Sequence, residues 1–424
     1  MAADMITMQP NHRKNLLPYY VKGLANGKFT LTQASESTGY TNRYLWELKR
    51  KYLTQGMAIF DTPQRKSPPN KIPEWIRQRV VKIYLKDYQN VNFKYFSECL
   101  KEYEDIDISY HTVRLIMNDY GIKSPDAHHV KKKKTVHRQR FCRQNEGDLI
   151  QIDGTPFAWF SKFGDNKRYA LHGSIDDATG KITALYMTEN ECLYGYLEIL
   201  RQTIQNHGIP REIYSDRAAI FCVTPKNKKN LTVWEELAGI HDKRTQWQRI
   251  LSELSINQIL AWSPQAKGKV ERMWQTLQGQ LPQYFYLNGV NSVEKANKIL
   301  HNYIEDFNSK YQKQPIKNDI FYREYDIEIP LDELLCARIT RKTDHSGVFS
   351  FHGYKWQIMD YNRVACRNFE LCISEKGLYA NLDNNYYPVH LLEDILDSID
   401  ETMPQVLQNI VYRYMFAFAK EISI

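Results

Sequence analysis

Three acidic residues stand in settings that suit metal-dependent chemistry on a phosphodiester bond. Asp153 and Asp216 each follow a short apolar stretch typical of a buried strand, and Glu271 lies in a stretch with helical periodicity. Carboxylates that converge from two strands and a helix can hold a pair of Mg²⁺ ions, which stabilise the attacking and leaving oxygens of a phosphodiester displacement. The three residues are therefore candidates for a site that cuts and joins DNA.

Alternation and periodicity predict the elements that would position these acids. The pattern predicts strands at 148–159, 169–176, 181–188, 212–215 and 255–261, and helices at 191–207, 245–254 and 265–284. Because side chains alternate along a strand, Gln151, Asp153 and Thr155 should share one face, with the apolar neighbours on the other. Asp216 should lie just beyond the end of its strand, where open parallel sheets place ligand groups.

The predicted helix at 265–284 carries one apolar and one polar stripe. The residues expected to face the core are Val270, Met273, Leu277 and Leu281. The residues expected on the polar stripe are Lys267, Glu271, Gln275 and Gln278. The third acid and a basic side chain should therefore project from the helix together.

Other acidic residues compete with the three candidates. Asp176 and Asp177 lie near Asp153 in the sequence, but their position at a hairpin is typical of turn residues. Glu235, Glu236 and Glu253 compete with Glu271, but they lack its context of proline, glycine and basic residues. A single Asp on a strand or Glu on a helix is usually solvated, so the combination carries the prediction.

Composition places the chain in a broad class. Its 424 residues, of which 42% are apolar, exceed one ordinary domain and can bury several cores. Residues 1–147 carry a net charge of +12 and the remainder −4, which together give +8 and indicate a polyanionic partner such as nucleic acid. The seven scattered cysteines form no C-x-x-C pair, which fits a reducing compartment. No stretch is apolar enough to span a bilayer, so we expect no membrane association and a cytoplasmic location.

A first helical region at residues 13–55 has the pattern of a helix-turn-helix. Ala34 is small enough for close helix packing, Gly39 permits the turn, and Thr41 or Asn42 can cap the next helix. The residues that this helix would present to a major groove are Asn42, Arg43 and Lys49.

A second helical set begins at Pro73, after a proline-rich linker, and ends near Gly121. Ser109 is a candidate N-cap of its last helix and Gly121 a candidate C-terminal stop. The residues predicted to contact DNA in this second helix-turn-helix are Tyr110, His111 and Arg114. Either helical unit could instead be a small helical bundle with no DNA contact.

A basic linker at 125–146 follows. Its candidate DNA-binding residues are Lys131, Lys132, Lys133, Lys134, Arg138 and Arg140. In the predicted helix at 265–284 the candidates for phosphate contact are Lys267, Lys269 and Arg272. A charge run is also typical of a solvated linker.

The order of elements from 147 to 284 resembles the ribonuclease-H-like core of the DDE transposases and retroviral-type integrases. The specific pieces are the residues around Asp153, the stretch that ends at Asp216, and the proline- and lysine-containing run before Glu271. With two preceding helix-turn-helix units, the whole chain looks like a bacterial insertion-sequence transposase of the kind grouped as ISNCY.

The resemblance implies roles for residues and partners. Asp153, Asp216 and Glu271 would be the catalytic residues and the metal ligands, with two Mg²⁺ per site and Mn²⁺ as a substitute. The partners would be double-stranded DNA, as transposon inverted repeats and as target, and further copies of the chain in a homodimer or larger homo-oligomer. The activity would be cleavage at the transposon ends and strand transfer into target DNA.

One spacing departs from the family. The 62 residues between Asp153 and Asp216 are ordinary, but 54 separate Asp216 from Glu271, where the family more often has about 35. The excess fits an insertion at 222–243, rich in Lys and Asn, which is either a loop that contacts DNA or a neutral surface insertion.

The C-terminal third is predicted to begin with helices at 291–325. A β-rich segment at 331–392 is similar to the small barrel that follows the catalytic core in this family. Basic residues on its strands could contact DNA or have a structural role; they are Arg338, Arg341, Lys342 and Lys355. A final helix at 405–420 should bury one face against the rest of the protein.

The predicted fold class is a multidomain α+β protein. The expected parts are a helix-turn-helix domain at 1–60, a second at 71–124, a basic linker at 125–146, a ribonuclease-H-like domain with a mixed five-stranded sheet at 147–286, a helical connector at 287–330, a small β-barrel at 331–392 and a helical tail at 393–424. A transposase is the first hypothesis. A non-catalytic DNA-binding regulator derived from a transposase and a ribonuclease-H-like nuclease are the alternatives.

Overall fold

The computed structural model describes residues 10–60, 72–125, 142–223, 244–261, 268–359, 364–383, 385–392 and 403–416. The chain divides into two compact units, residues 1–82 and 83–424, and each is described by itself. The predicted basic linker and most of the predicted insertion therefore lie outside the described residues. So do Lys131, Lys132, Lys133, Lys134, Arg138, Arg140 and Lys267.

Three helices form the first unit's core: α1 (Pro10–Ala25), α2 (Leu31–Thr38) and α3 (Asn42–Gln55). A capping box at Thr30 starts α2, and Gly39 ends it in the left-handed conformation, with φ 71°. Thr41 then caps α3 by accepting a hydrogen bond from the Tyr44 N–H, as the sequence predicted. Ala34 is fully buried between the helices. The geometry agrees with the expected turn between two helices, and DNA binding by this unit stays a prediction.

The second helical set comprises α4 (Glu74–Asp87), α5 (Phe93–Tyr103) and α6 (Tyr110–Asp119). Aromatic rings bring α4 and α5 together, because Tyr84 and Tyr88 each lie about 5 Å from the ring of Phe96. Ser109 caps α6, and Gly121 follows it with a φ of 74°, so both predicted end signals are present.

A mixed five-stranded sheet forms the centre of the larger unit, in the order β3-β2-β1-β4-β5. Its strands are β1 (Leu149–Phe157), β2 (Tyr169–Asp176), β3 (Ile182–Thr188), β4 (Glu212–Ser215) and β5 (Asn257–Leu260). β2 pairs antiparallel with β1 and β3, whereas β4 pairs parallel with β1 and β5. The predicted mixed sheet of five strands is confirmed.

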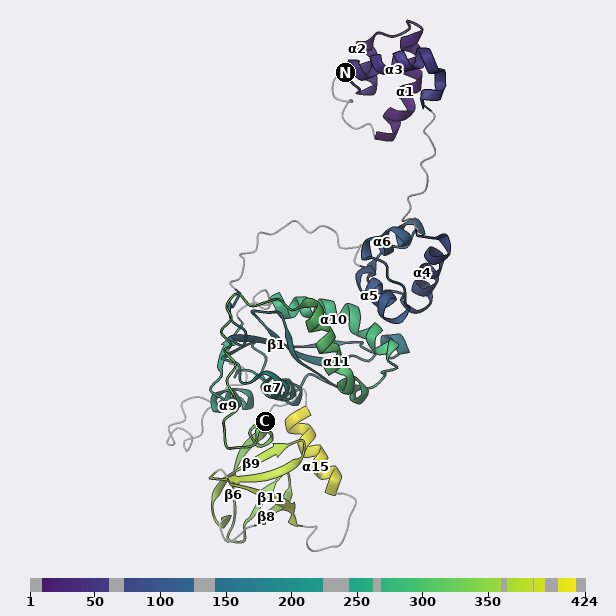
Figure 1. Cartoon of the computed structure of the whole chain (residues 1–424). Coiled ribbons are helices and arrows are strands. Elements are labelled where there is room, and N and C mark those ends of the chain that lie inside the picture. Colours follow the sequence, from purple (N-terminus) through teal and green to yellow (C-terminus); the bar gives the residue numbers. More distant parts are fainter. Residues whose placement is uncertain are drawn as a thin grey trace. The chain divides into compact units, whose positions relative to one another are not determined.

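Helices cover both faces of this sheet. The helices on one face are α10 (Gly268–Leu287) and α11 (Val293–Tyr311), and those on the other are α7 (Leu193–His207) and α9 (Gln246–Glu253) (Figure 1). The α10 residues predicted to face the core, Val270, Met273, Leu277 and Leu281, are all buried. Each face of the sheet therefore has its own apolar core.

A buried histidine lies between β2 and α7. The Nδ1 of His172 is 3.3 Å from the Tyr186 carbonyl, and its Nε2 is 3.4 Å from the Cys192 N–H. A neutral ring with its proton on Nδ1 satisfies both contacts, whereas a charged ring would be buried without an acceptor at Nε2. Burial accordingly lowers the pKa of His172 to about 4.

We expect this histidine to make the larger unit sensitive to acid. Its pKa is about 4 when folded and 6.5 in its ordinary state, so the unfolded chain binds the extra proton first as pH falls. The stabilisation that the neutral His172 ring contributes is complete above pH 6.5 and is lost as pH falls toward 4. This loss lowers the free energy of unfolding by about 3 kcal/mol. Thermal midpoints measured between pH 7 and 4.5 should fall less steeply in His172→Gln. Parallel curves for the two proteins would contradict the assignment.

The connector after α11 departs from the expectation. A helix over residues 291–325 is wrong beyond Tyr311, because Gln312 is extended, with φ −64° and ψ 149°. Pro315 lacks an N–H and disfavours helix in the residue before it. The segment instead runs along the sheet domain, where Phe321 donates to the Glu146 carbonyl and Arg323 bridges to Ile209.

Six antiparallel strands follow in the order β6-β9-β10-β11-β8-β7. They are β6 (Ala337–Lys342), β7 (Val348–Phe351), β8 (Tyr354–Ile358), β9 (Asn368–Ser374), β10 (Gly377–Leu382) and β11 (Asn385–Leu391), and the short helix α12 (Leu331–Leu334) precedes them. Among the described residues the outer strands β6 and β7 do not pair with each other, and a closed barrel stays a prediction.

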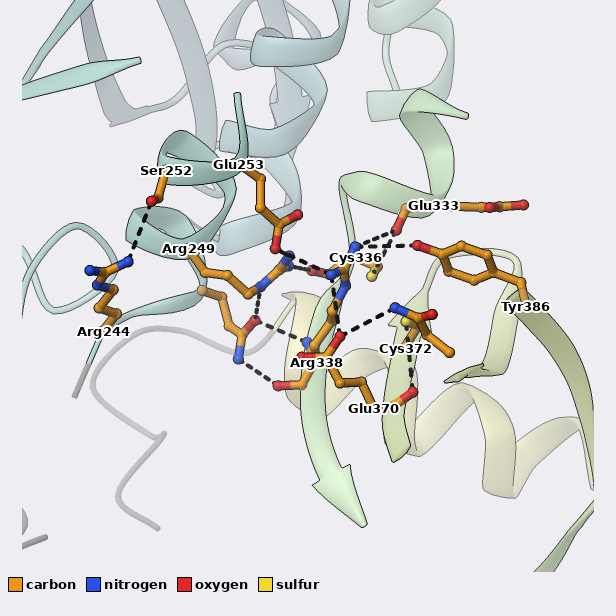
Figure 2. A network of polar contacts seen from close by, with 12 residues as sticks. Arg244, Arg249, Ser252, Glu253, Glu333, Cys336, Arg338, Glu370, Cys372 and Tyr386 are labelled. Carbon is orange, nitrogen blue, oxygen red and sulfur yellow. Dashed lines mark hydrogen bonds and ion pairs between the residues drawn. The ribbon is translucent and has the colours of Figure 1, made fainter. Parts of the chain in front are cut away.

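Arg338 of β6 joins this sheet to α9. Its guanidinium lies 3.2 Å from a carboxylate oxygen of Glu253 and 3.3 Å from one of Glu370, and only 8% of its side chain is exposed (Figure 2). Gln246 of α9 adds two hydrogen bonds to the Arg338 backbone. Of the two roles considered for Arg338, this network supports the structural one.

The chain's last described helix is α15 (Met403–Val411), continued by a π-helical turn, Tyr412–Phe416. Ile410, Val411 and Met415 are buried, and Phe416 lies 4.5 Å from the ring of Tyr194 on α7. A buried face is therefore present as far as Phe416, where the described part of the predicted helix ends. Within the described ranges, no helix has the length and apolar character needed to cross a membrane.

Candidate active site

The two candidate aspartates follow paired residues of two neighbouring parallel strands. The register of β1 and β4 pairs Ile150 with Ile213 and Gln151 with Tyr214. Asp153 follows Gln151 by two residues and Asp216 follows Tyr214 by two, so a continuation of this register would bring the two aspartates opposite each other. Asp216 lies just beyond the end of β4, as predicted.

Helix α10 is attached to the face of β1 that carries Asp153. The Gln151 side chain accepts a hydrogen bond from the Val270 N–H at 3.3 Å, and Gln278 donates to the Thr155 hydroxyl at 3.3 Å. Between these contacts the indole of Trp274 donates to the Asp153 carboxylate at 3.0 Å. Alternate residues of the strand thus meet successive turns of the helix, and the predicted common face of Gln151, Asp153 and Thr155 is observed.

Gly173 provides the space for this indole. It lies opposite Asp153 on β2, and a β-carbon at Gly173 would lie only 2.7 Å from the Trp274 ring. Only a residue without a side chain lets the indole lie this close to β2. Gly173 therefore permits the position from which Trp274 holds one side of the Asp153 carboxylate.

Helix α7, on the other face of the sheet, contributes the buried Tyr196. The Tyr196 hydroxyl donates to the Glu191 carboxylate at 2.5 Å, and its ring lies 4.7 Å from that of His172. Burial raises the pKa of Tyr196 well above its ordinary value, and the negative charges of Glu191, Asp153 and Asp216 raise it further. The hydroxyl therefore stays protonated and available as a donor.

Glu271 lies in the first turn of α10, one turn before Trp274, and its side chain is exposed. Its neighbour Arg272 is exposed too and donates to the Gly268 carbonyl at 3.0 Å, while Lys269 is half-buried. Across the described part of the chain, no group of three or more His, Cys, Asp or Glu side chains is arranged to hold a metal ion. The donor types suit Mg²⁺, and the gathering of all three carboxylates stays a prediction.

The competing acids have structural partners. Asp176 accepts hydrogen bonds from the N–H groups of Gly147 and Thr179, and Asp177 accepts from the N–H of Arg143. Both are fully buried in the hairpin. Glu253 lies in the network of Figure 2, and Glu235 and Glu236 lie outside the described residues.

The candidate DNA-binding residues of the helical units lie largely at the surface. Asn42 and Arg43 of α3 are exposed, and Lys49 is half-buried. On α6, the side chains of Tyr110, His111 and Arg114 are all exposed. These positions permit contact with a groove, and the contact itself stays a prediction.

Sequence reasoning did not identify Trp274, Tyr196 or Glu191. Trp274 could have been found from its spacing, because it lies three residues after Glu271 and so occupies a nearby face of the same helix. Tyr196 and Glu191 flank the start of α7, and no local pattern separates them from ordinary core and cap residues.

We expect Trp274→Phe to slow DNA cleavage about tenfold, because the ring is kept while the hydrogen bond to Asp153 is lost. The thermal midpoint should change little. Trp356 of β8, a buried tryptophan whose indole donates to the Phe351 carbonyl at 3.1 Å, provides the matched control as Trp356→Phe. Equal cleavage rates in both variants would remove Trp274 from the site.

Comparisons with known proteins place the chain in a family. No family model matches the chain. It is 32% identical over 322 residues to the transposase of insertion sequence IS1202 from Streptococcus pneumoniae, covering 69% of this chain and 67% of that protein. It is 30% identical over 328 residues to the protein named as transposase y4bF of Sinorhizobium fredii, covering 77% of this chain and 68% of the relative.

Solved structures with remote likeness come from retroviruses. The simian T-cell lymphotropic virus intasome, solved with the PP2A regulatory subunit B56 gamma, has a TM-score of 0.31 and 14% identity, covering 73% of this chain and 95% of that chain. The HTLV-2 integrase catalytic core domain with magnesium has a TM-score of 0.27 and 16% identity, covering 37% of this chain and 83% of that chain.

The mixed five-stranded sheet and these curated relatives place the chain in the DDE transposase and integrase superfamily. The identity to the curated relatives shows that the chain belongs to the insertion-sequence transposases within it.

Proposed function

We propose that the chain binds the inverted repeats of its own element, cuts DNA at those ends and transfers the freed strands into target DNA. The observation that carries this proposal is the parallel pairing of β1 with β4 directly before Asp153 and Asp216, with α10 attached to the face of β1 that carries Asp153. Membership in the transposase family supports it.

Each residue of the site has a proposed task. Asp153 and Asp216 hold a divalent cation, and Glu271 completes the ligand set by turning its exposed side chain toward them. Mg²⁺ at this position would activate the attacking oxygen and stabilise the charge on the leaving oxygen. Trp274 and the Ala218 N–H keep the two aspartates oriented, through bonds of 3.0 and 2.8 Å.

The basic side chains bring DNA to this site. Lys269 and Arg272 on α10 would contact phosphates, which positions DNA without reading its sequence. Base contacts would come from α3 and α6, through Asn42, Arg43 and the exposed residues of α6. Because two transposon ends must meet, we propose that a homodimer or larger homo-oligomer assembles on DNA.

The test uses the full chain, Mg²⁺ or Mn²⁺, and DNA that carries the repeats flanking the coding sequence. We expect metal-dependent nicking at the ends, followed by joined products with a target duplex. Binding of the repeats without nicking would favour a non-catalytic regulator. Cleavage without dependence on the repeats and without joined products would favour a nuclease.

A further inference from the structure

A further carboxylate, that of Glu191, lies against the strand that carries Asp153. Glu191 precedes α7, and its carboxylate accepts the Tyr196 hydroxyl at 2.5 Å. A β-carbon placed on Gly154, the residue after Asp153, would lie 2.8 Å from that hydroxyl and 3.3 Å from the carboxyl carbon of Glu191. Glu191 and Tyr196 therefore contact the β1 backbone directly after the first aspartate.

The contact is held by the surrounding core. Tyr196 is buried among rings, with His172 at 4.7 Å, Phe221 at 4.6 Å and Trp247 at 6.2 Å. These rings prevent the phenol from moving away, so its hydroxyl has a fixed position. A hydrogen bond to a fixed donor orients the half-buried Glu191 carboxylate as well.

We propose that Glu191 is a fourth acidic residue of this active site, which strengthens the binding of a divalent cation by its charge, and that Tyr196 is the positioning residue that holds it there. The inference rests on the proposed function, because it needs a cation at Asp153 and Asp216. Negative charges gathered without a cation repel one another, and a nearby divalent cation offsets that repulsion. The raised pKa of Tyr196, to which Glu191, Asp153 and Asp216 all contribute, agrees with this gathering of charge.

The first test measures Mn²⁺ binding to the full chain without DNA. The method is isothermal titration calorimetry or the electron paramagnetic resonance signal of free Mn²⁺. Glu191→Gln should weaken Mn²⁺ binding roughly tenfold, as expected when one nearby charge is removed. Gln can still accept from Tyr196, so the thermal midpoint without metal should not fall. Glu189→Gln is the matched control, because Glu189 is an exposed residue paired with Lys167 and carries the same charge.

The second test asks whether Tyr196 acts through Glu191. Tyr196→Phe should weaken Mn²⁺ binding about threefold in the native background and not further in Glu191→Gln. Tyr286→Phe, which removes an exposed hydroxyl on α10, should leave the affinity unchanged. If the losses in Mn²⁺ affinity from the two substitutions add in the double variant, Tyr196 acts independently of Glu191. That result would overturn its assigned role.

The outcomes separate this inference from the proposed function. If Asp216→Asn abolishes Mn²⁺ binding while Glu191→Gln behaves like Glu189→Gln, only the role of Glu191 is overturned. If Asp216→Asn leaves Mn²⁺ affinity unchanged, the proposed metal site fails and the inference falls with it.

Discussion

Replacement of Asp216 by Asn should reduce DNA-end cleavage and strand transfer at least about a thousandfold. An Asn oxygen can still accept the Ala218 N–H that Asp216 accepts at 2.8 Å, so the local turn should persist. The lost negative charge removes the ligand that a divalent cation needs. The measurement is the single-turnover rate of end nicking in Mg²⁺, with the thermal midpoint as a check of folding.

Asp165 offers a closely matched control. Its side chain accepts the N–H two residues further on, from Lys167 at 2.9 Å, as Asp216 does from Ala218. The residue lies on the loop before β2, outside the strand that carries Asp153 and the strand that precedes Asp216, so Asp165→Asn should cleave at the native rate. Similar rates for Asp216→Asn and Asp165→Asn would remove Asp216 from the site.

Replacement of Gly195 by Ala should destabilise the larger unit by about 3 kcal/mol. Gly195 lies in α7 directly against β2, and a β-carbon there would lie 2.3 Å from two atoms of the His172 ring. The ring cannot withdraw, because it is fully buried and contacts the Tyr186 carbonyl and the Cys192 N–H. Chemical denaturation followed by tryptophan fluorescence measures the loss.

A double-mutant cycle tests this cause. His172→Ala should by itself lower the free energy of unfolding. It also removes the atoms that collide with the new methyl group. The double variant should therefore be more stable, by over about 1 kcal/mol, than the sum of the two single losses implies. Gly279→Ala is the control, because Gly279 lies on an exposed face of α10. Its new β-carbon would lie 3.5 Å from the nearest atom, which is an ordinary contact. That change should be neutral or stabilising by up to about 1 kcal/mol. Additive losses in the cycle would place the strain elsewhere.

Much of the catalytic fold could be predicted because its elements carry local signals. Two strands, Tyr169–Asp176 and Glu212–Ser215, have the bounds that alternation and apolar runs indicate. The helix at α10 was predictable from its apolar stripe, although Trp274 was missed from it. The error beyond Tyr311 was avoidable, since Pro315 marks the end of a helical pattern.

The remaining features depend on contacts between distant parts of the chain. Trp274 and Asp153 are 121 positions apart, and Gly173 matters only because the indole lies against it. From the sequence, Arg338 could equally have contacted DNA. The structure shows Glu253 and Glu370 as its partners. Local patterns determine elements, whereas these side chains acquire their roles from tertiary packing.

The most direct measurement of the central claim replaces Mg²⁺ by Fe²⁺ in the full chain and adds ascorbate and peroxide, so that radicals formed at the bound metal cut the nearby backbone. Competition by excess Mg²⁺ provides the control. If the three carboxylates share a metal site, cuts should appear beside Asp153, Asp216 and Glu271, and excess Mg²⁺ should suppress them. Cuts confined to other parts of the chain, or cuts at only one of the three acids, would contradict it.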